Sequence, residues 1–166
     1  YPSGKRMGEI LLENLSNAER KEINENLLLP ELAEEFYRIK GNNKNSLIRI
    51  LSKTFIDFQP TSTSCHDKIV SIPHFKTVIT TNYDKLFENA YGGEGQLIYS
   101  PAQIPYIDKN KTSIFKIHGD LTEPNSIIIT KSDYIRFFAE NTEYNILWTL
   151  IKERISTNCI LFMGYN

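Results

Sequence analysis

The chain of 166 residues has only two cysteines, Cys65 and Cys159, and neither has a second cysteine close to it in sequence. This excludes a disulfide-rich secreted scaffold and the paired cysteines of a structural zinc site. We therefore expect free thiols, a cytoplasmic protein and no bound zinc. No apolar run approaches the roughly 20 residues of a membrane-spanning helix. Residues 1–6 lack the apolar segment of a signal peptide.

An excess of charge of one sign is also lacking. There are 19 Lys and Arg residues and 20 Asp and Glu residues, which gives a formal net charge of -1. A domain that binds nucleic acid or an anionic membrane usually has a basic surplus, so we expect neither partner. Hydrophobic residues make up 40% and charged residues 23% of the chain, as in an ordinary globular protein.

Hydrophobic periodicity divides the chain into two parts. Residues 5–58 repeat apolar side chains at helical spacing and predict a helical module. Residues 65–166 alternate short β-branched runs with helical stretches, which is typical of an α/β fold with a three-layer, mainly parallel sheet. We predict a single domain over 1–166, with the helical module packed on the sheet. The expected strands are 75–81, 96–99, 113–117, 126–129 and 159–163.

Two of the expected strands end abruptly in polar residues. One apolar run leads into residues 80–84, Thr-Thr-Asn-Tyr-Asp, and another leads into His118 and Gly119. Open α/β sheets bind their ligands beyond the carboxyl ends of the strands. We therefore expect Asn82, Asp84 and His118 to converge at the rim of the sheet as a small catalytic set.

Each of these residues also has a purely structural interpretation. His118 could be a core histidine bonded to backbone, and Asn82 could cap the helix that follows it. Asp84 could be a first-turn carboxylate that interacts with the helix dipole. Gly164 could be an ordinary turn glycine, and His66 is expected to have a structural or surface role.

Several short motifs, in order along the chain, resemble those of the bacterial sirtuin-like (SIR2-like) domain family. Residues 80–84 look like its Thr-x-Asn-x-Asp box, and residues 116–120, Lys-Ile-His-Gly-Asp, look like its His-Gly box. Residues 162–165, Phe-Met-Gly-Tyr, resemble the start of its late glycine turn. The run 131–134, Lys-Ser-Asp-Tyr, also fits the bacterial branch. Residues 2–4, Pro-Ser-Gly, resemble the segment just after the family's phosphate-binding loop.

The resemblance implies a Rossmann-like fold and chemistry on NAD. Asn82 would position the ribose and the attacking water, and His118 would be the general base. Asp84 would help to hold the nicotinamide carboxamide, and Gly164 would let the backbone approach the nucleotide. The cofactor contacts that the resemblance implies are Thr80, Thr81, Asp84, Gly119 and Gly164.

Three departures from the family pattern narrow the expected function. The glycine-rich phosphate loop should precede Tyr1 and is missing, so we expect a fragment of a longer protein. The zinc cysteines of the protein deacylases are absent, and Thr81 stands where deacylases carry Gln. These two features favour the zinc-less branch, whose members are typically NAD-consuming effectors of antiphage defence.

The leading hypothesis is therefore hydrolysis of NAD to nicotinamide and ADP-ribose. A second hypothesis is a non-catalytic module that binds NAD or ADP-ribose or supports oligomerisation. A third, protein deacylation, is disfavoured by the missing zinc cysteines. The expected partners are NAD or ADP-ribose, a fused or separate sensor domain and, in a homo-oligomer, further copies of the chain.

Overall fold

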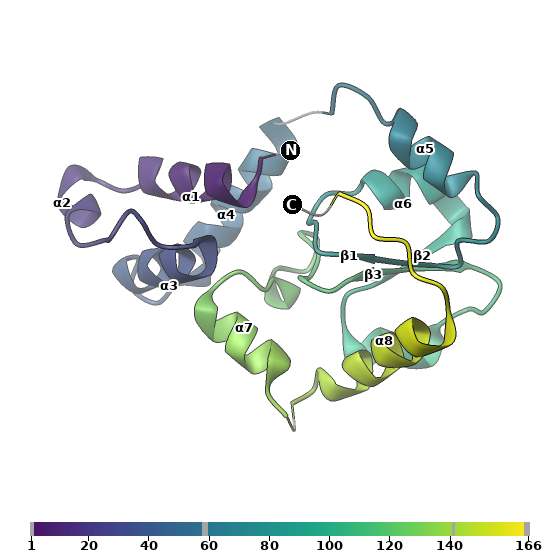
Figure 1. The fold of residues 1–166 in the computed structure, drawn as a ribbon. Coiled ribbons are helices and arrows are strands. Elements are labelled where there is room, and N and C mark those ends of the chain that lie inside the picture. Colours follow the sequence, from purple (N-terminus) through teal and green to yellow (C-terminus); the bar gives the residue numbers. More distant parts are fainter. Residues whose placement is uncertain (1, 58–59, 141, 165–166) are drawn as a thin grey trace.

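The computed structural model describes residues 2–57, 60–140 and 142–164 (Figure 1). Its centre is a sheet of three parallel strands, in the order β1-β3-β2. These are β1 (Thr77–Thr80), β2 (Gly95–Ile98) and β3 (Thr112–Lys116). Because parallel strands end at the same edge of a sheet, the residues that follow β1 and β3 meet at one rim.

Helices cover both faces of the sheet (Figure 1). The helices α5 (Ser64–Val70) and α6 (Leu86–Tyr91) lie on one face, and α8 (Asn145–Thr157) lies on the other, with the 3₁₀ helix η2 (Pro101–Tyr106). The central strand β3 is buried along its whole length, as expected of a parallel strand between two helical layers. The predicted Rossmann-like α/β class, with a mainly parallel sheet and helices on both sides, is confirmed. Two further 3₁₀ turns are η1 (Gly92–Glu94) and η3 (Pro124–Ser126).

The helical region at the start of the chain consists of α1 (Gly4–Glu13), α2 (Asn17–Arg20), α3 (Leu29–Ile39) and α4 (Lys44–Asp57). The hydroxyls of Ser3 and Ser16 accept backbone N–H groups at the starts of α1 and α2, which satisfies donors that a helix end leaves unpaired. The apolar faces of α1, α3 and α4 form one buried cluster that also includes Ile127 and Ile129. These helices therefore complete their core with the segment that follows β3.

Polar contacts fix the start of α7 (Lys131–Phe138) against the helical region. Lys44 of α4 donates to the two carboxylate oxygens of Asp133 at 2.8 and 2.7 Å and to the carbonyl oxygen of Ile127 at 2.6 Å. Asp133 also accepts the N–H of Thr130, and the two residues form the capping box that begins α7. The orientation of α7 is thus set by its own cap and by a cation from α4.

Two of the expected strands are wrong. Of the strand expected over 126–129, Ser126 belongs to η3, and residues 127–129 are buried but form no strand. One backbone bond joins them to the β3 exit, from the N–H of Ile128 to the carbonyl of His118 at 3.0 Å. Residues 159–163 are extended and exposed, with Phe162 80% exposed. An apolar, β-branched composition predicts extended backbone, but it does not by itself supply a pairing partner.

The turn after β3 depends on Gly119. This glycine has a φ of +89°, and a Cβ there would overlap the carbonyl group of Ser126 and come within 2.8 Å of the Ile127 nitrogen. We expect Gly119→Ala to lower the free energy of unfolding by more than about 2 kcal/mol, because left-handed strain adds to a backbone clash. Urea denaturation measures the loss.

The matched control is Gly93→Ala, because Gly93 is exposed and a Cβ added there would meet no atom of the described residues within 4 Å. Its free energy of unfolding should stay the same or rise slightly. Equal stability of the two alanine variants would contradict the assignment of Gly119 as a packing glycine.

Candidate functional site

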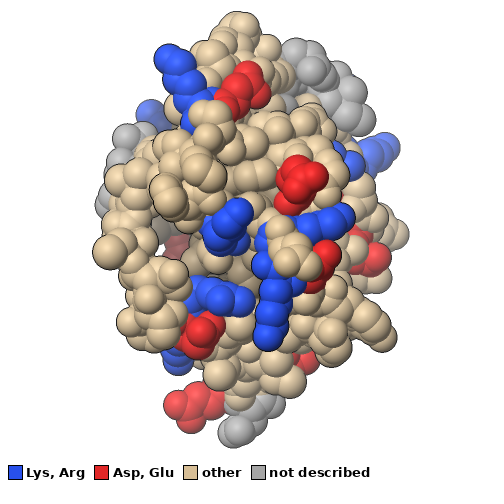
Figure 2. All heavy atoms as spheres, turned by 90° about the vertical axis from the view of Figure 1, so that its right-hand side faces the viewer, with Lys and Arg blue, Asp and Glu red and all other residues tan. Residues whose placement is uncertain are grey.

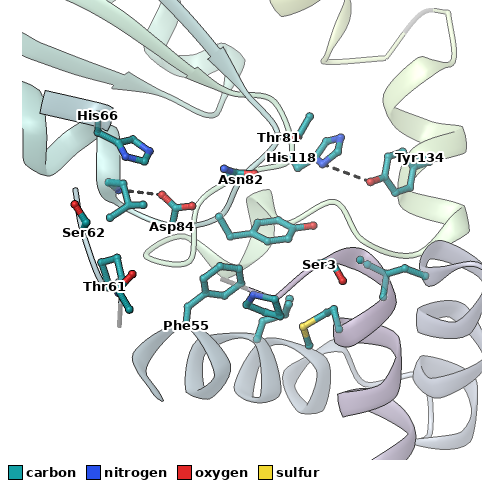
Figure 3. Close-up of a pocket in the computed structure, with 18 residues that line it drawn as sticks. Ser3, Phe55, Thr61, Ser62, His66, Thr81, Asn82, Asp84, His118 and Tyr134 are labelled. Atoms are coloured by element: carbon teal, nitrogen blue, oxygen red, sulfur yellow. Dashed lines mark hydrogen bonds between the residues drawn. The ribbon is translucent and has the colours of Figure 1, made fainter. Parts of the chain in front are cut away.

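A cavity of about 660 Å³ lies where the carboxyl ends of β1 and β3 meet the helical region (Figure 3). Its wall is formed by the start of α1, by α4 and by loop residues 60–62 and 81–84, together with His118 and Tyr134. The volume falls within the range of about 300–1,000 Å³ found for small-molecule sites. The sheet rim at which the sequence predicts a ligand site therefore borders a cavity that is shared with the helices.

The loop after β1 brings Thr81, Asn82 and Asp84 to this cavity. The N–H of Asn82 donates to Oγ1 of Thr80 at 3.1 Å, which turns the chain at the end of the strand. Figure 3 shows Asn82 between Asp84 and His118. Asn82 is exposed and α6 begins only at Leu86, so the cap interpretation of Asn82 is wrong.

Asp84 serves the helix that Asn82 was expected to cap. Its Oδ1 accepts the N–H of Leu86 at 3.0 Å, and the residue is only 8% exposed. The sequence predicts a helix from Tyr83 to about Tyr91, but α6 begins only at Leu86, because an aspartate turn occupies the first residues of that range. Asp84 still lies in the cavity wall, so the turn contact to Leu86 and a ligand contact are compatible.

Lys116, the last residue of β3, holds the loop after β1 in place. Its ammonium group, fully buried, donates to the carbonyl oxygens of Tyr83 and Asp84 at 3.0 and 2.6 Å. It also pairs with Glu88 of α6 at 2.9 Å and with the buried carboxylate of Asp120 at 2.6 Å. Burial raises the pKa of Asp120, but hydrogen bonds from Lys116 and Thr122 outweigh it and leave that pKa below its ordinary value.

His118 enters the cavity from the turn after β3. Its Nδ1 lies 3.4 Å from the hydroxyl oxygen of Tyr134, and the two rings meet edge to face with centroids 5.2 Å apart. Burial lowers the pKa of His118 to about 4, while a hydrogen bond to the Thr81 backbone acts in the opposite direction. The imidazole is therefore neutral at physiological pH and can accept a proton.

Two tyrosines of the cavity wall were missed as site residues. Tyr134 projects from the first turn of α7 to His118, and Tyr83 donates its hydroxyl to the carbonyl of Ile128 at 2.5 Å. Burial raises the pKa of both phenols, so both remain protonated. Residues 130–133 match a capping box and predict the start of a helix, but nothing local indicates that this helix packs beside residue 118.

His66 also lines the cavity, near Asp84 in Figure 3. Its ring meets Phe87 edge to face at 4.9 Å, and its Nδ1 is buried without a hydrogen-bond partner in the part of the chain that the structure describes. A structural or surface role is expected for His66 from the sequence. Its Nδ1 is in addition a buried polar atom of a residue that lines the cavity.

Three residues expected to contact the cofactor are not among those that line this cavity. Thr80 supports Asn82 through its hydroxyl, and Gly119 packs against Ser126. Gly164 lies on the exposed terminal segment with a φ of +66°. Tyr165, the last residue of the third motif, lies outside the described residues.

A three-stranded parallel sheet with helices on both faces and polar side chains gathered at the carboxyl ends of its strands defines a Rossmann-like α/β domain. The family model of the SIR2-like domain matches residues 76–166, more than half of the chain. The chain therefore belongs to the SIR2-like domain family. The match begins one residue before β1 and includes both motifs that form the wall of the cavity.

Curated relatives cover nearly the whole chain at modest identity. The chain is similar to defense-associated sirtuin 2 of Bacillus subtilis, with 29% identity over 99% of the chain and 16% of that protein. It is also similar to the NAD(+) hydrolases ThsA of Enterococcus faecium (27% identity, 83% of the chain, 29% of that protein) and of Acinetobacter baumannii (26%, 99% and 34%). The chain thus spans about a third or less of the length of these relatives.

Among residues 2–57, 60–140 and 142–164, no group of three or more His, Cys, Asp or Glu residues is placed to hold a metal ion. None of the helices within these ranges is long and apolar enough to cross a membrane. On the face shown in Figure 2, lysine and arginine side chains gather near the centre with acidic side chains beside them.

The buried ion cluster yields a stability prediction. Lys116→Met leaves the carboxylates of Asp120 and Glu88 without their buried cation, so we expect the free energy of unfolding to fall by about 3–5 kcal/mol. Adding Asp120→Asn should restore part of the loss, because one of the two unpaired charges is removed. Urea denaturation of both variants measures this.

The matched control is Lys111→Met, which removes an exposed lysine just before β3 and should change stability by no more than about 0.5 kcal/mol. A Lys116→Met variant as stable as this control would contradict the role assigned to the buried ammonium group.

Proposed function

We propose that the domain hydrolyses NAD to nicotinamide and ADP-ribose. The observation that carries the proposal is the placement of Asn82 and His118 in the wall of one cavity at the sheet rim. The names of three relatives, NAD(+) hydrolase ThsA, support the same reaction. The reaction is proposed for the protein that contains this domain, since the relatives are several times longer.

The chemistry suits a site without a pair of catalytic carboxylates. Cleavage of the nicotinamide–ribose bond passes through an oxocarbenium-like transition state, as glycoside hydrolysis does. The leaving group is a cationic pyridinium that departs as a neutral molecule, so it needs no strong general acid. The site has to hold the ribose and to supply an oriented water molecule.

Asn82 and His118 divide these tasks. The amide of Asn82 can donate and accept hydrogen bonds together, so it can hold a ribose hydroxyl and a water molecule. His118 is the general base, acting on water or a ribose hydroxyl. Because its pKa is only about 4, its proton affinity is low, and we place its contribution near the lower end of the usual range of about 10²–10⁴-fold.

The start of α1 offers a place for the negative charge of the dinucleotide. Pro2, Ser3 and Gly4 line the cavity, and the first N–H groups of an α-helix together with its dipole favour phosphate. Asp84 is proposed to hold the nicotinamide carboxamide, and Thr81 to contact the cofactor beside it. Thr80, Gly119 and Gly164 remain proposed cofactor contacts that would require a ligand to extend beyond this cavity.

The biological setting is proposed from the relatives. One of them is named a defense-associated sirtuin, and we propose that this domain acts as an NAD-consuming effector in antiphage defence in the cytoplasm. The free, exposed thiols of Cys65 and Cys159 suit a reducing compartment. A fused or separate sensor domain, and assembly of several copies, would supply the control that such an activity needs.

Nicotinamide release by the full-length gene product tests the proposed reaction. His118→Ala should lower kcat by about 10²-fold, and Asn82→Ala should lower it as well, with the fold retained by circular dichroism. Wild-type activity should stay level from pH 8 to 6 and fall only toward pH 4, because the base must be unprotonated and its pKa is about 4.

His74→Ala is the matched control, because His74 is exposed and is not a lining residue of the cavity; it should retain wild-type activity. If His118→Ala hydrolyses NAD as fast as His74→Ala, the catalytic assignment is wrong. Calorimetric binding of ADP-ribose without turnover of NAD would favour the binding module, and strict dependence on an acylated lysine peptide would favour deacylation.

A further inference from the structure

We propose that Tyr134 is a positioning residue for His118: its hydroxyl donates to Nδ1 of the imidazole and thereby leaves the ring proton on Nε2. The inference rests on the proposed function, since it concerns the base of that reaction. It adds a residue from α7, outside the strand-end motifs, to the site.

Contacts of the preceding residue and of the ring itself fix the position of the Tyr134 side chain. The residue follows Asp133, whose carboxylate is held by Lys44 and by the N–H groups of Ile129 and Thr130. Its ring stacks on Phe138 one turn later, at a centroid distance of 6.5 Å. The phenol therefore reaches the cavity from a rigid helix start.

The hydrogen bond joins two neutral groups. Burial raises the pKa of Tyr134 and lowers that of His118, so a neutral phenol faces a neutral imidazole. A neutral imidazole carries a proton on one ring nitrogen and a lone pair on the other. In the proposed arrangement Nδ1, the nitrogen 3.4 Å from the Tyr134 hydroxyl, has the lone pair and accepts from that hydroxyl, and Nε2 carries the proton.

Within the described residues, the titratable groups named below, all close to the imidazole, already have other partners. Tyr83, from the loop after β1, faces His118 with ring centroids 6.5 Å apart, and its hydroxyl is already bonded to Ile128. The carboxylate of Asp133 is occupied by Lys44 and the α7 cap. Lys116 and Asp120, two residues away on either side, are paired with each other.

The distance of 3.4 Å is long for a hydrogen bond. Contacts of this kind are often long in a free site and shorten when the substrate excludes water. Without the hydroxyl, the imidazole loses one of its restraints, so it turns more easily about its side-chain bond and exchanges its proton more readily between the two nitrogens. A smaller fraction of the molecules would then hold the His118 imidazole in the orientation and tautomer that the reaction needs.

The variant Tyr134→Phe removes only the hydroxyl and keeps both ring contacts. In the full-length protein, we expect kcat for nicotinamide release to fall about 3- to 10-fold, the worth of one neutral hydrogen bond, with KM nearly unchanged. In a His118→Ala background the same change should have no further effect. Tyr144→Phe, which alters a half-buried tyrosine away from the cavity, is the matched control.

A spectroscopic measurement tests the proposal even if NAD is not the substrate. Selective ¹⁵N labelling of histidine, with the His118 signals assigned by their loss in His118→Gln, should show a proton on Nε2 and an accepting Nδ1 in the wild type. Tyr134→Phe should give averaged tautomers. An unchanged tautomer together with unchanged kcat, or a full effect of Tyr134→Phe in the absence of His118, would overturn the proposal.

Discussion

One buried cation holds the site together. The ammonium group of Lys116 lies in the interior and is surrounded by two backbone carbonyls, from Tyr83 and Asp84, and by two carboxylates. Taking an ammonium ion out of water costs several kcal/mol unless partners replace the lost hydration. The chain can therefore fold with Lys116 inside only if the loop after β1 closes over the end of β3. That closure is what brings Asn82 next to His118.

A second polar cluster fixes the wall of the cavity that lies opposite the sheet rim. Lys44 and Asp133 join α4 to the start of α7, while Ile127 and Ile129 lie in the core of the helical region. The cavity is the space between a sheet rim fixed by Lys116 and helices fixed by Lys44. Its polar groups are thus attached to secondary structure on both sides, which favours a preorganised ligand site over one that must assemble around its ligand.

The parts of this site that could be predicted from sequence lie next to strands. A β-branched run that ends in Asn or His marks the carboxyl end of a parallel strand, and the sheet geometry then brings residues 82 and 118 together. The capping box at Thr130 was also predictable, because it involves only neighbouring residues. These features are local, or they follow from a general rule of α/β folds.

The remainder depends on tertiary packing. Tyr134 meets His118 only because α7 is held against α4, and no periodicity indicates that contact. Residues 127–129 have the composition of a strand, but Ile127 and Ile129 complete the core of the helical region instead, while Ile128 packs in the cluster of Phe115 and Phe137. In the sequence, Lys116 looks like an ordinary polar residue in a strand. It can be buried only because groups up to 33 residues away in the chain accept its hydrogen bonds.

The central claim is that Asn82 and His118 flank the anomeric carbon of a ribose. A crystal structure of the full-length protein with ADP-ribose tests it most directly. We predict that the terminal ribose occupies the cavity, with its anomeric carbon between the Asn82 amide and the His118 imidazole. ADP-ribose bound elsewhere, for example in the apolar groove between Ile104 and Ile146, would contradict the account.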